Sequence, residues 1–206
     1  MFNLIVDNEI GLRTFHPDDA EEFFNLVERN RPRLRPWINP ETLPGTAKAA
    51  RIFTIECFFY FRDNSSETWA LFDQYFPELD GNFLSPRPAT EMGIWYNDNL
   101  VGQVTLSRLS DSYTAAEFGY WITAEHEGKG IITRCVSALM DYAIENMKIE
   151  RFVIGCALSN LPSCGIPLRL GYRLHATIPN GEVVGEFIYD LVIYGIRSNS
   201  WRERKK

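Results

Sequence analysis

A turn with two glycines, Glu127-Gly128-Lys129-Gly130, contains the residues of this chain that could most directly do chemistry. The segment before it, 115–123, is rich in aromatic and β-branched residues and predicts a strand. After it, apolar residues recur at helical spacing, at Val136, Leu139, Met140, Ala143 and Ile144. Glycines lack a Cβ and let the backbone approach a bulky anion, and the N–H groups of a first helical turn can bind a phosphate. The sequence therefore predicts an anion-binding turn, with a plain strand-to-helix connection as the alternative.

The turn does not match two well-known phosphate-binding motifs. A Walker loop needs a Gly-Lys-Ser/Thr four residues after an earlier glycine, and a dinucleotide fingerprint needs a third glycine; both are missing here. A second strand is predicted at 151–157, followed by Asn160, Ser163, a short amphipathic run and Leu170-Gly171-Tyr172. The interpretation of the turn therefore depends on this combination of segments.

Taken together, these segments resemble the GNAT superfamily of acyl-CoA-dependent N-acetyltransferases, and most closely its RimJ/RimL branch, which acetylates the N-termini of ribosomal proteins. The likeness covers roughly residues 91–196. The family's pyrophosphate loop corresponds to 127–132 and its Tyr-Trp strand end to Tyr120-Trp121. Its Asn-x-x-Ser and Leu-Gly-Phe segments correspond to Asn160, Ser163 and Leu170-Gly171-Tyr172. The resemblance implies an α/β (α+β) GNAT fold, in which helices flank a mixed central sheet and splayed parallel strands form an acetyl-CoA cleft.

The resemblance also implies which residues bind acetyl-CoA. The strand end would contact the thioester arm through backbone N–H groups, and the turn with the first helical residues would bind the pyrophosphate. Asn160 would hold the pantetheine amides, with closure of its own turn as the alternative role. The implied cofactor-binding residues are Tyr120, Trp121, Ile122, Thr123, Glu127, Gly128, Lys129, Gly130, Ile131, Ile132, Thr133, Asn160 and Ser163.

Two residues of the turn depart from the family's pattern. Glu127 stands where Gln or Arg is usual, and Ile132 stands where a small residue is usual. Because the loop works through backbone N–H groups, neither change forbids binding. A carboxylate aimed at a pyrophosphate would repel it, so we expect the Glu127 side chain to point away.

Acetyl transfer to an amine needs a base, a group that polarises the carbonyl, and help for the departing thiolate. The resemblance implies direct transfer without an acyl-enzyme, with Glu117 on the central strand as the base. Alternation does not fix the face on which Glu117 lies, so a structural strand residue is an equal alternative. Many family members carry a tyrosine general acid where this chain has Pro167. Ser163 is the replacement candidate, with a helix N-cap as its alternative role.

Composition limits the other classes of function. The 206 residues suit one domain over 1–206, with an insertion at 62–89 that would be a substrate lid, a dimer contact or surface elaboration. A formal net charge of −6 argues against nucleic-acid binding and suits a cationic amine. The four cysteines are scattered and no histidines complete a zinc set, so we expect no metal site. No signal peptide or membrane-spanning stretch is evident, which predicts a cytoplasmic protein.

The remaining elements are predicted from local patterns. A first strand is expected at 9–15, helices from Pro17 and over 45–62, and a short helix at 69–76. Two strands, 90–96 and 100–106, are expected to pair around Asn97-Asp98-Asn99, and a turn is expected at 111–112. A short helix at 163–170 should end at Gly171. Two last strands, 172–178 and 186–195, should turn at 179–181, and the tail from Arg197 should be frayed.

The sequence therefore predicts an acetyl-CoA-dependent N-acetyltransferase acting on a primary amine, either a protein N-terminus or a small molecule. A non-catalytic CoA-binding sensor or scaffold is the alternative, favoured by Glu127 and the missing tyrosine. A homodimer is compatible with the RimJ/RimL branch, but no residue pattern shows it.

Overall fold

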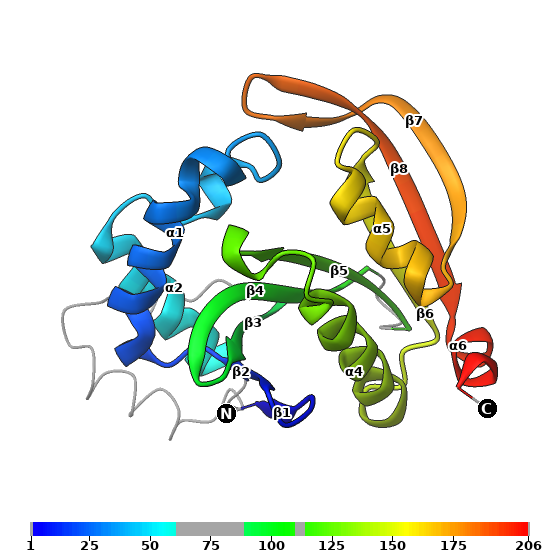
Figure 1. Cartoon of the computed structure of the whole chain (residues 1–206), viewed down its shortest axis with the longest axis horizontal. Coiled ribbons are helices and arrows are strands. Elements are labelled where there is room, and N and C mark those ends of the chain that lie inside the picture. Colours follow the sequence, from blue (N-terminus) through cyan, green and yellow to red (C-terminus); the bar gives the residue numbers. More distant parts are fainter. Residues whose placement is uncertain (1, 61–88, 110–113, 206) are drawn as a thin grey trace.

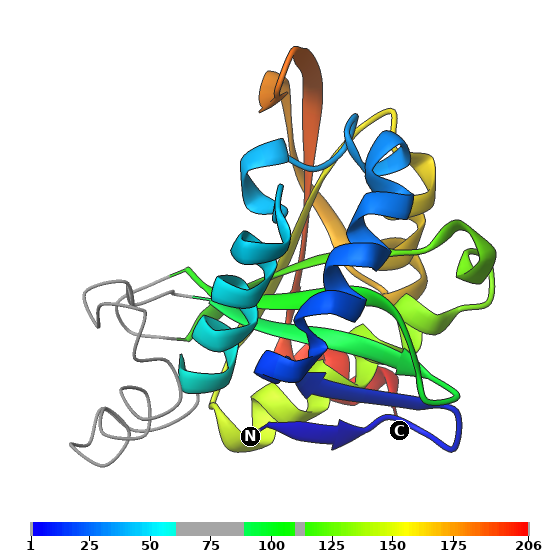
Figure 2. The same cartoon turned by 90° about the vertical axis from the view of Figure 1, so that its left-hand side faces the viewer.

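The computed structural model describes residues 2–60, 89–109 and 114–205, and these form one sheet with helices on both faces (Figures 1 and 2). The insertion expected at 62–89 lies almost wholly outside these residues, as do the expected helix at 69–76 and the turn at 111–112. The strands are β1 (Asn3–Ile5), β2 (Ile10–Thr14), β3 (Ala89–Tyr96), β4 (Asn99–Arg108), β5 (Ala115–Ile122), β6 (Arg151–Ala157), β7 (Arg173–Val184) and β8 (Phe187–Arg197). The α-helices are α1 (Ala20–Leu34), α2 (Ala47–Tyr60), α4 (Ile131–Asn146), α5 (Leu161–Leu170) and α6 (Ser198–Arg204).

The eight strands follow the order β1-β2-β3-β4-β5-β6-β8-β7. Every neighbouring pair is antiparallel except β5 and β6, which run parallel. The β5–β6 ladder covers only three residue pairs, from Ala115↔Arg151 to Glu117↔Val153. Beyond Glu117 the two strands separate, which confirms the mixed sheet with splayed parallel strands.

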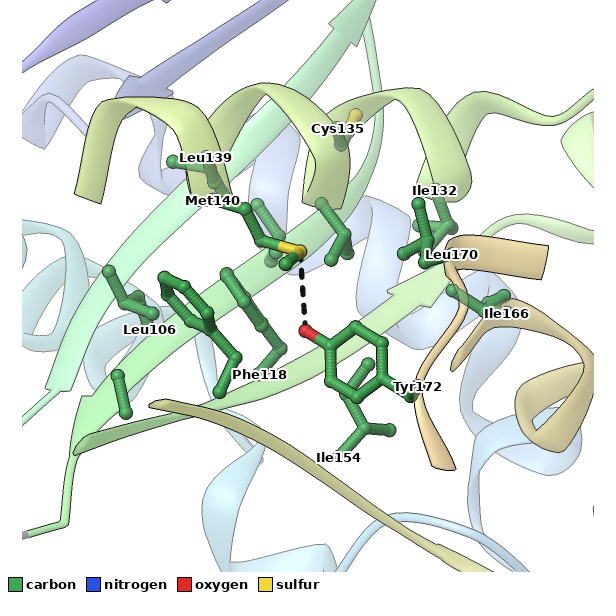
Figure 3. Packing of buried hydrophobic residues seen from close by; sticks show 14 of the residues in the cluster. Leu106, Phe118, Ile132, Cys135, Leu139, Met140, Ile154, Ile166, Leu170 and Tyr172 are labelled. Carbon is green, nitrogen blue, oxygen red and sulfur yellow. Dashed lines mark hydrogen bonds between the residues drawn. The ribbon is translucent and has the colours of Figure 1, made fainter. Parts of the chain in front are cut away.

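Two apolar cores hold the helices against the sheet. The first packs α4 and α5 on one face, where side chains such as Phe118, Met140 and Tyr172 are buried and the Tyr172 hydroxyl donates to Met140 Sδ at 3.3 Å (Figure 3). The second packs α1 and α2 on the other face around Phe15, Phe23 and Phe53. Because both faces of β4 and β5 are covered, these strands form a rigid base for the residues that protrude where β5 and β6 separate.

The turn between β3 and β4 is as predicted. Asn97 and Asp98 have φ values of 48° and 62°, and this left-handed pair suits a two-residue hairpin turn. The prediction for the turn of the last hairpin was wrong. The turn lies at Gly185 and Glu186, and Gly185 has a φ of 56°. The predicted turn at 179–181 is instead a bulge inside β7, where the register shifts between Ile178 and Glu182.

The C-terminal tail is also not frayed. Residues Ser198–Arg204 form α6, and Trp201 is buried with its Nε1 donating to Asp141 of α4 at 2.7 Å. The strand β1 was not predicted, and α1 continues through Pro32 to Leu34. In each case tertiary packing outweighs the local signal.

Candidate active site

A cleft of about 950 Å³ opens where β5 and β6 separate. Its lining residues come from the C-terminal part of α1, the ends of β5 and β6, the glycine turn, the first turns of α4 and α5, and the tip of the β7–β8 hairpin. One cavity therefore connects the predicted anion-binding turn with the carboxyl-bearing centre of the sheet.

The glycine turn has the geometry that an anion cradle requires. Gly128 and Gly130 have φ values of 72° and 73°, in the left-handed region that favours glycine. A Cβ built on either glycine would meet nothing within 4 Å, so the space in front of the turn is open. Gly130 is the N-cap of α4 and provides no side-chain cap for the N–H groups of the first helical turn, whose residues Ile131, Ile132 and Thr133 line the cleft. The turn therefore fits a diphosphate.

Two arginines flank this cradle. Arg33 of α1 donates to Glu127 Oε1 and to the carbonyl oxygen of Ile122. On the opposite side, Nε of Arg169 in α5 donates to Thr133 Oγ1 at 3.4 Å. Both arginines line the cleft. Glu127 is therefore paired with a cation from a helix that lies about 90 residues earlier in the chain.

On the α1–α2 side of the sheet, polar side chains of β3, β4 and β5 form a chain of hydrogen bonds. Trp121 Nε1 donates to Gln103 Oε1 at 2.9 Å, and Gln103 Nε2 donates to Glu91 Oε2 at 2.5 Å. Thr105 Oγ1 also donates to Glu91 Oε2, at 2.6 Å. All four residues line the cleft. Because its contacts are made within the sheet, Glu91 serves mainly to fix the cleft wall.

Two further carboxyl groups, those of Glu117 and Glu182, have raised pKa values, and the charge of Glu117 contributes to the shift at Glu182. Glu117 is half-buried at the point where β5 and β6 separate, and burial raises the pKa of its carboxyl against the opposing effect of a hydrogen bond from the Gly155 backbone. Glu182 lines the cleft, and burial together with the charge of Glu117 raises the pKa of its carboxyl. Among the described residues, Oε2 of Glu182 is buried without a hydrogen-bond partner. An unpartnered, partly desolvated carboxylate is suited to accept a proton.

The side chain of Tyr120, a residue of β5, reaches the first turn of α5. Its hydroxyl donates to the Ser163 carbonyl oxygen at 3.2 Å, and Ser163 Oγ lies 3.5 Å from that hydroxyl. Burial raises the pKa of Tyr120 far above its ordinary value, so the hydroxyl stays protonated and can donate. Asn160 is the N-cap of α5 and accepts from the Ser163 N–H at 3.3 Å, so the capping role proposed for Ser163 belongs to Asn160.

This arrangement can be compared with known proteins. The family model described as "Acetyltransferase (GNAT) domain" matches residues 9–173. The chain belongs to the GNAT acetyltransferase family. YdaF of Bacillus subtilis (strain 168), named as a candidate ribosomal N-acetyltransferase, is 30% identical over 205 residues and 100% of each chain. The ribosomal-protein-serine acetyltransferase of Escherichia coli (strain K12) is 31% identical over 101 residues, which cover 49% of this chain and 56% of that protein.

Solved structures agree with this fold. The ribosomal L7/L12 α-N-protein acetyltransferase RimL, in complex with coenzyme A, superimposes with a TM-score of 0.76. The match covers 95% of this chain and 98% of that chain at 19% identity. The likeness to this solved structure confirms the predicted GNAT fold. The family match shows the acetyltransferase class.

In this GNAT acetyltransferase, most of the predicted site residues lie on the cleft. The lining includes Tyr120, Trp121, Ile122, Glu127, Gly128, Gly130, Ile131, Ile132, Thr133, Asn160 and Ser163. Three predicted residues are not part of it. Thr123 is buried with Oγ1 at 2.7 Å from His126 Nδ1, and Lys129 lies over the Tyr96 ring at 5.8 Å. Glu117 Oε1 lies next to Gly155, 3.3 Å from the position that a Cβ on that glycine would take. Their roles remain predictions.

Sequence reasoning missed Glu182, Arg33 and the aromatic pair Trp37–Tyr189. The Trp37 and Tyr189 rings stack at 5.4 Å, and Arg35 pairs with Glu186 at 2.7 Å. Through these contacts the β7–β8 hairpin reaches across to the end of α1 (Figure 1). The part of the cleft beside Glu182 is therefore bridged by the β7–β8 hairpin. No local pattern indicated Glu182, because it follows the segment 179–181 that the sequence predicts as a turn.

Two further findings concern metals and membranes. Within the described ranges, no group of three or more His, Cys, Asp and Glu side chains is arranged to hold a metal ion. No helix in that part of the chain is long and apolar enough to cross a bilayer.

Proposed function

We propose that this GNAT acetyltransferase transfers the acetyl group of acetyl-CoA directly to the terminal amine of a flexible protein N-terminus. The observation that carries the proposal is the single cleft that joins the glycine cradle to Glu182 through the separated strands β5 and β6. The names of the relatives support a ribosomal-protein N-terminus as acceptor. The hairpin bridge favours a slender chain end over a bulky compact molecule.

The proposed chemistry uses residues on both sides of the cleft. The Glu182 carboxylate takes a proton from the acceptor ammonium, with Glu117 close by. The free amine attacks the thioester carbonyl, so that a C–N bond forms, the C–S bond breaks and the nitrogen releases a second proton. Backbone N–H groups at the end of β5 polarise the carbonyl. The Tyr120 hydroxyl, held against Ser163, donates a hydrogen bond to the departing thiolate, which takes up the second proton released by the nitrogen.

The experiment measures release of the CoA thiol with N-terminally free peptides as acceptors, and mass spectrometry locates the acetyl group. We expect Glu182→Gln to lower kcat by roughly 10²- to 10⁴-fold while acetyl-CoA binding stays unchanged, because only the base is lost. Glu145→Gln, a change to an exposed residue at the end of α4, is the matched control. Full activity of Glu182→Gln would assign the base elsewhere, with Glu117→Gln as the next variant.

The sensor or scaffold alternative predicts a different result. Such a protein would bind acetyl-CoA but would acetylate no N-terminal peptide and no small amine. The Arg33 contact removes one argument for this alternative, because the off-pattern Glu127 is paired within the cleft.

A further inference from the structure

Arg33 is the one residue of α1 that reaches the glycine turn through hydrogen bonds found among the described residues. Its guanidinium joins Glu127 on the turn and the Ile122 carbonyl oxygen at the end of β5. Its side chain is 34% exposed, and that of Glu127 is 47% exposed. Both residues line the cleft, so a ligand in the cradle would lie against this ion pair.

The guanidinium has donor capacity to spare. Nε of Arg33 is buried and, within the described ranges, has no hydrogen-bond partner. Such an atom costs free energy unless a ligand or solvent satisfies it. Guanidinium groups bind phosphate oxygens in a bidentate manner, which makes a diphosphate a suitable partner.

The charges around the turn give the second argument. Glu127 places a negative charge where a diphosphate would lie, and Lys129 is directed toward the Tyr96 ring. Arg33 neutralises that charge from outside the turn. Without Arg33 the turn would present an uncompensated carboxylate to an anionic ligand, which would repel it.

We propose that Arg33 is a diphosphate-binding residue of the acyl-CoA site, and that Glu127 holds its guanidinium in position until the diphosphate takes over that contact. Arg33 thereby supplies, from α1, a positive charge beside the negatively charged Glu127. The inference rests on the proposed function only in taking acetyl-CoA as the ligand of the cradle.

The test compares two ligands by calorimetry. Acetyl-CoA carries the diphosphate, whereas S-acetylpantetheine has the same thioester arm without it. We expect Arg33→Gln to weaken acetyl-CoA binding roughly ten- to a hundredfold, the value of a hydrogen bond to a charged group. Binding of S-acetylpantetheine should change by less than about twofold. Arg31→Gln is the matched control, since Arg31 lies on the same helix and bonds to Glu28 and to the Pro44 carbonyl oxygen.

Two further variants separate charge from shape. Arg33→Lys keeps the charge and serves if Arg33→Gln fails to fold; acetyl-CoA should bind it more weakly than wild type, because a bidentate contact is lost. Glu127→Gln should bind acetyl-CoA at least as tightly as wild type, because a competing anion is removed. If Glu127 only shaped the turn, Glu127→Gln would weaken both ligands.

The outcomes distinguish this inference from the proposed function. Equal weakening of both ligands by Arg33→Gln, or no weakening of either, would overturn the role of Arg33 while the wild type still binds and transfers. If the wild-type protein binds no acetyl-CoA, both proposals fail together.

Discussion

At the scale of single residues, the Glu117–Glu182 pair determines how activity should depend on pH. Burial first, and the charge of Glu117 second, raise the pKa of Glu182 above its ordinary value of 4.5. A base acts in its deprotonated form, so kcat/KM should rise with pH through this raised pKa. Glu117→Gln removes the negative neighbour and should shift the rising limb to lower pH. A pH–rate profile checks this, and an unchanged limb would show that Glu117 exerts no influence.

The same pair affects stability with the opposite sign. A carboxyl whose pKa is raised on folding binds protons more tightly in the native state than in the unfolded state. Its contribution is therefore most favourable below the ordinary value of 4.5 and is lost as pH rises through the raised pKa. Near neutral pH these two ionised carboxylates therefore lower the stability of the folded protein, while ionisation makes Glu182 able to accept a proton.

The thiols Cys156 and Cys164 should be unreactive despite their positions beside the cleft. Their Sγ atoms lie 3.2 Å apart and both residues are buried. Burial, reinforced by Cys164, raises the pKa of Cys156 far above its ordinary value, so the nucleophilic thiolate is scarce. We expect neither thiol to react with iodoacetamide at pH 7 in the folded protein, whereas both react after denaturation. Rapid labelling of Cys156 in the native state, seen by mass spectrometry, would contradict this expectation and would support a mechanism with an acyl-enzyme intermediate.

The sequence could predict those site residues that lie within a recognisable motif, but not those that other elements bring to the site. The glycine turn and the start of α4 were predicted because glycines and a helix start are local signals. Arg33 and Glu182 were not found, because their positions depend on α1 crossing the sheet and on a bulge in β7. The alternation of side chains between the two faces of the sheet is interrupted at that bulge, so the sequence pattern could not predict the face on which Glu182 lies.

At the scale of elements, Gly102 controls how closely β4 and β5 approach at the cleft. A Cβ on Gly102 would lie 2.3 Å from the Trp121 carbonyl oxygen and 2.9 Å from Ile122 Cα, so backbone would have to move. We expect Gly102→Ala to lower the free energy of unfolding by about 1–3 kcal/mol and to reduce acetyl-CoA affinity. Gly11→Ala on β2 is the control, because a Cβ there meets nothing within 4 Å. Urea denaturation of both variants measures the difference, and equal stabilities would show that β4 can shift freely.

Elements with a clear turn or helix-end signal were predicted well, whereas a very short strand and a strand that continues through a turn-like segment were not. The β3–β4 hairpin follows from Asn97-Asp98, and α5 ends at Gly171 with a φ of 82°, as expected. By contrast, β1 has only three residues, and β7 continues past the predicted turn because it pairs with β8 on both sides of residues 179–181. Pro179, Asn180 and Gly181 form a strong turn signal, yet the strand pairing on both sides turns this segment into a bulge.

At the scale of the whole molecule, α6 closes the sheet against α4. Trp201 is 4% exposed, its Nε1 bonds to Asp141 at 2.7 Å, and Lys205 pairs with the same carboxylate. We expect Trp201→Ala to lower the free energy of unfolding by about 3–5 kcal/mol, because a buried aromatic ring and its hydrogen bond are both lost. Lys205→Ala, an exposed partner of Asp141, should cost at most about 1 kcal/mol. Because Trp201 does not line the cleft, kcat at a temperature where the variant is folded should match wild type. Denaturation curves and kinetic measurements on both variants check these expectations. An unchanged free energy of unfolding for Trp201→Ala would mean that α6 does not stabilise the fold. A large loss of kcat would mean that α6 supports the site as well as the fold.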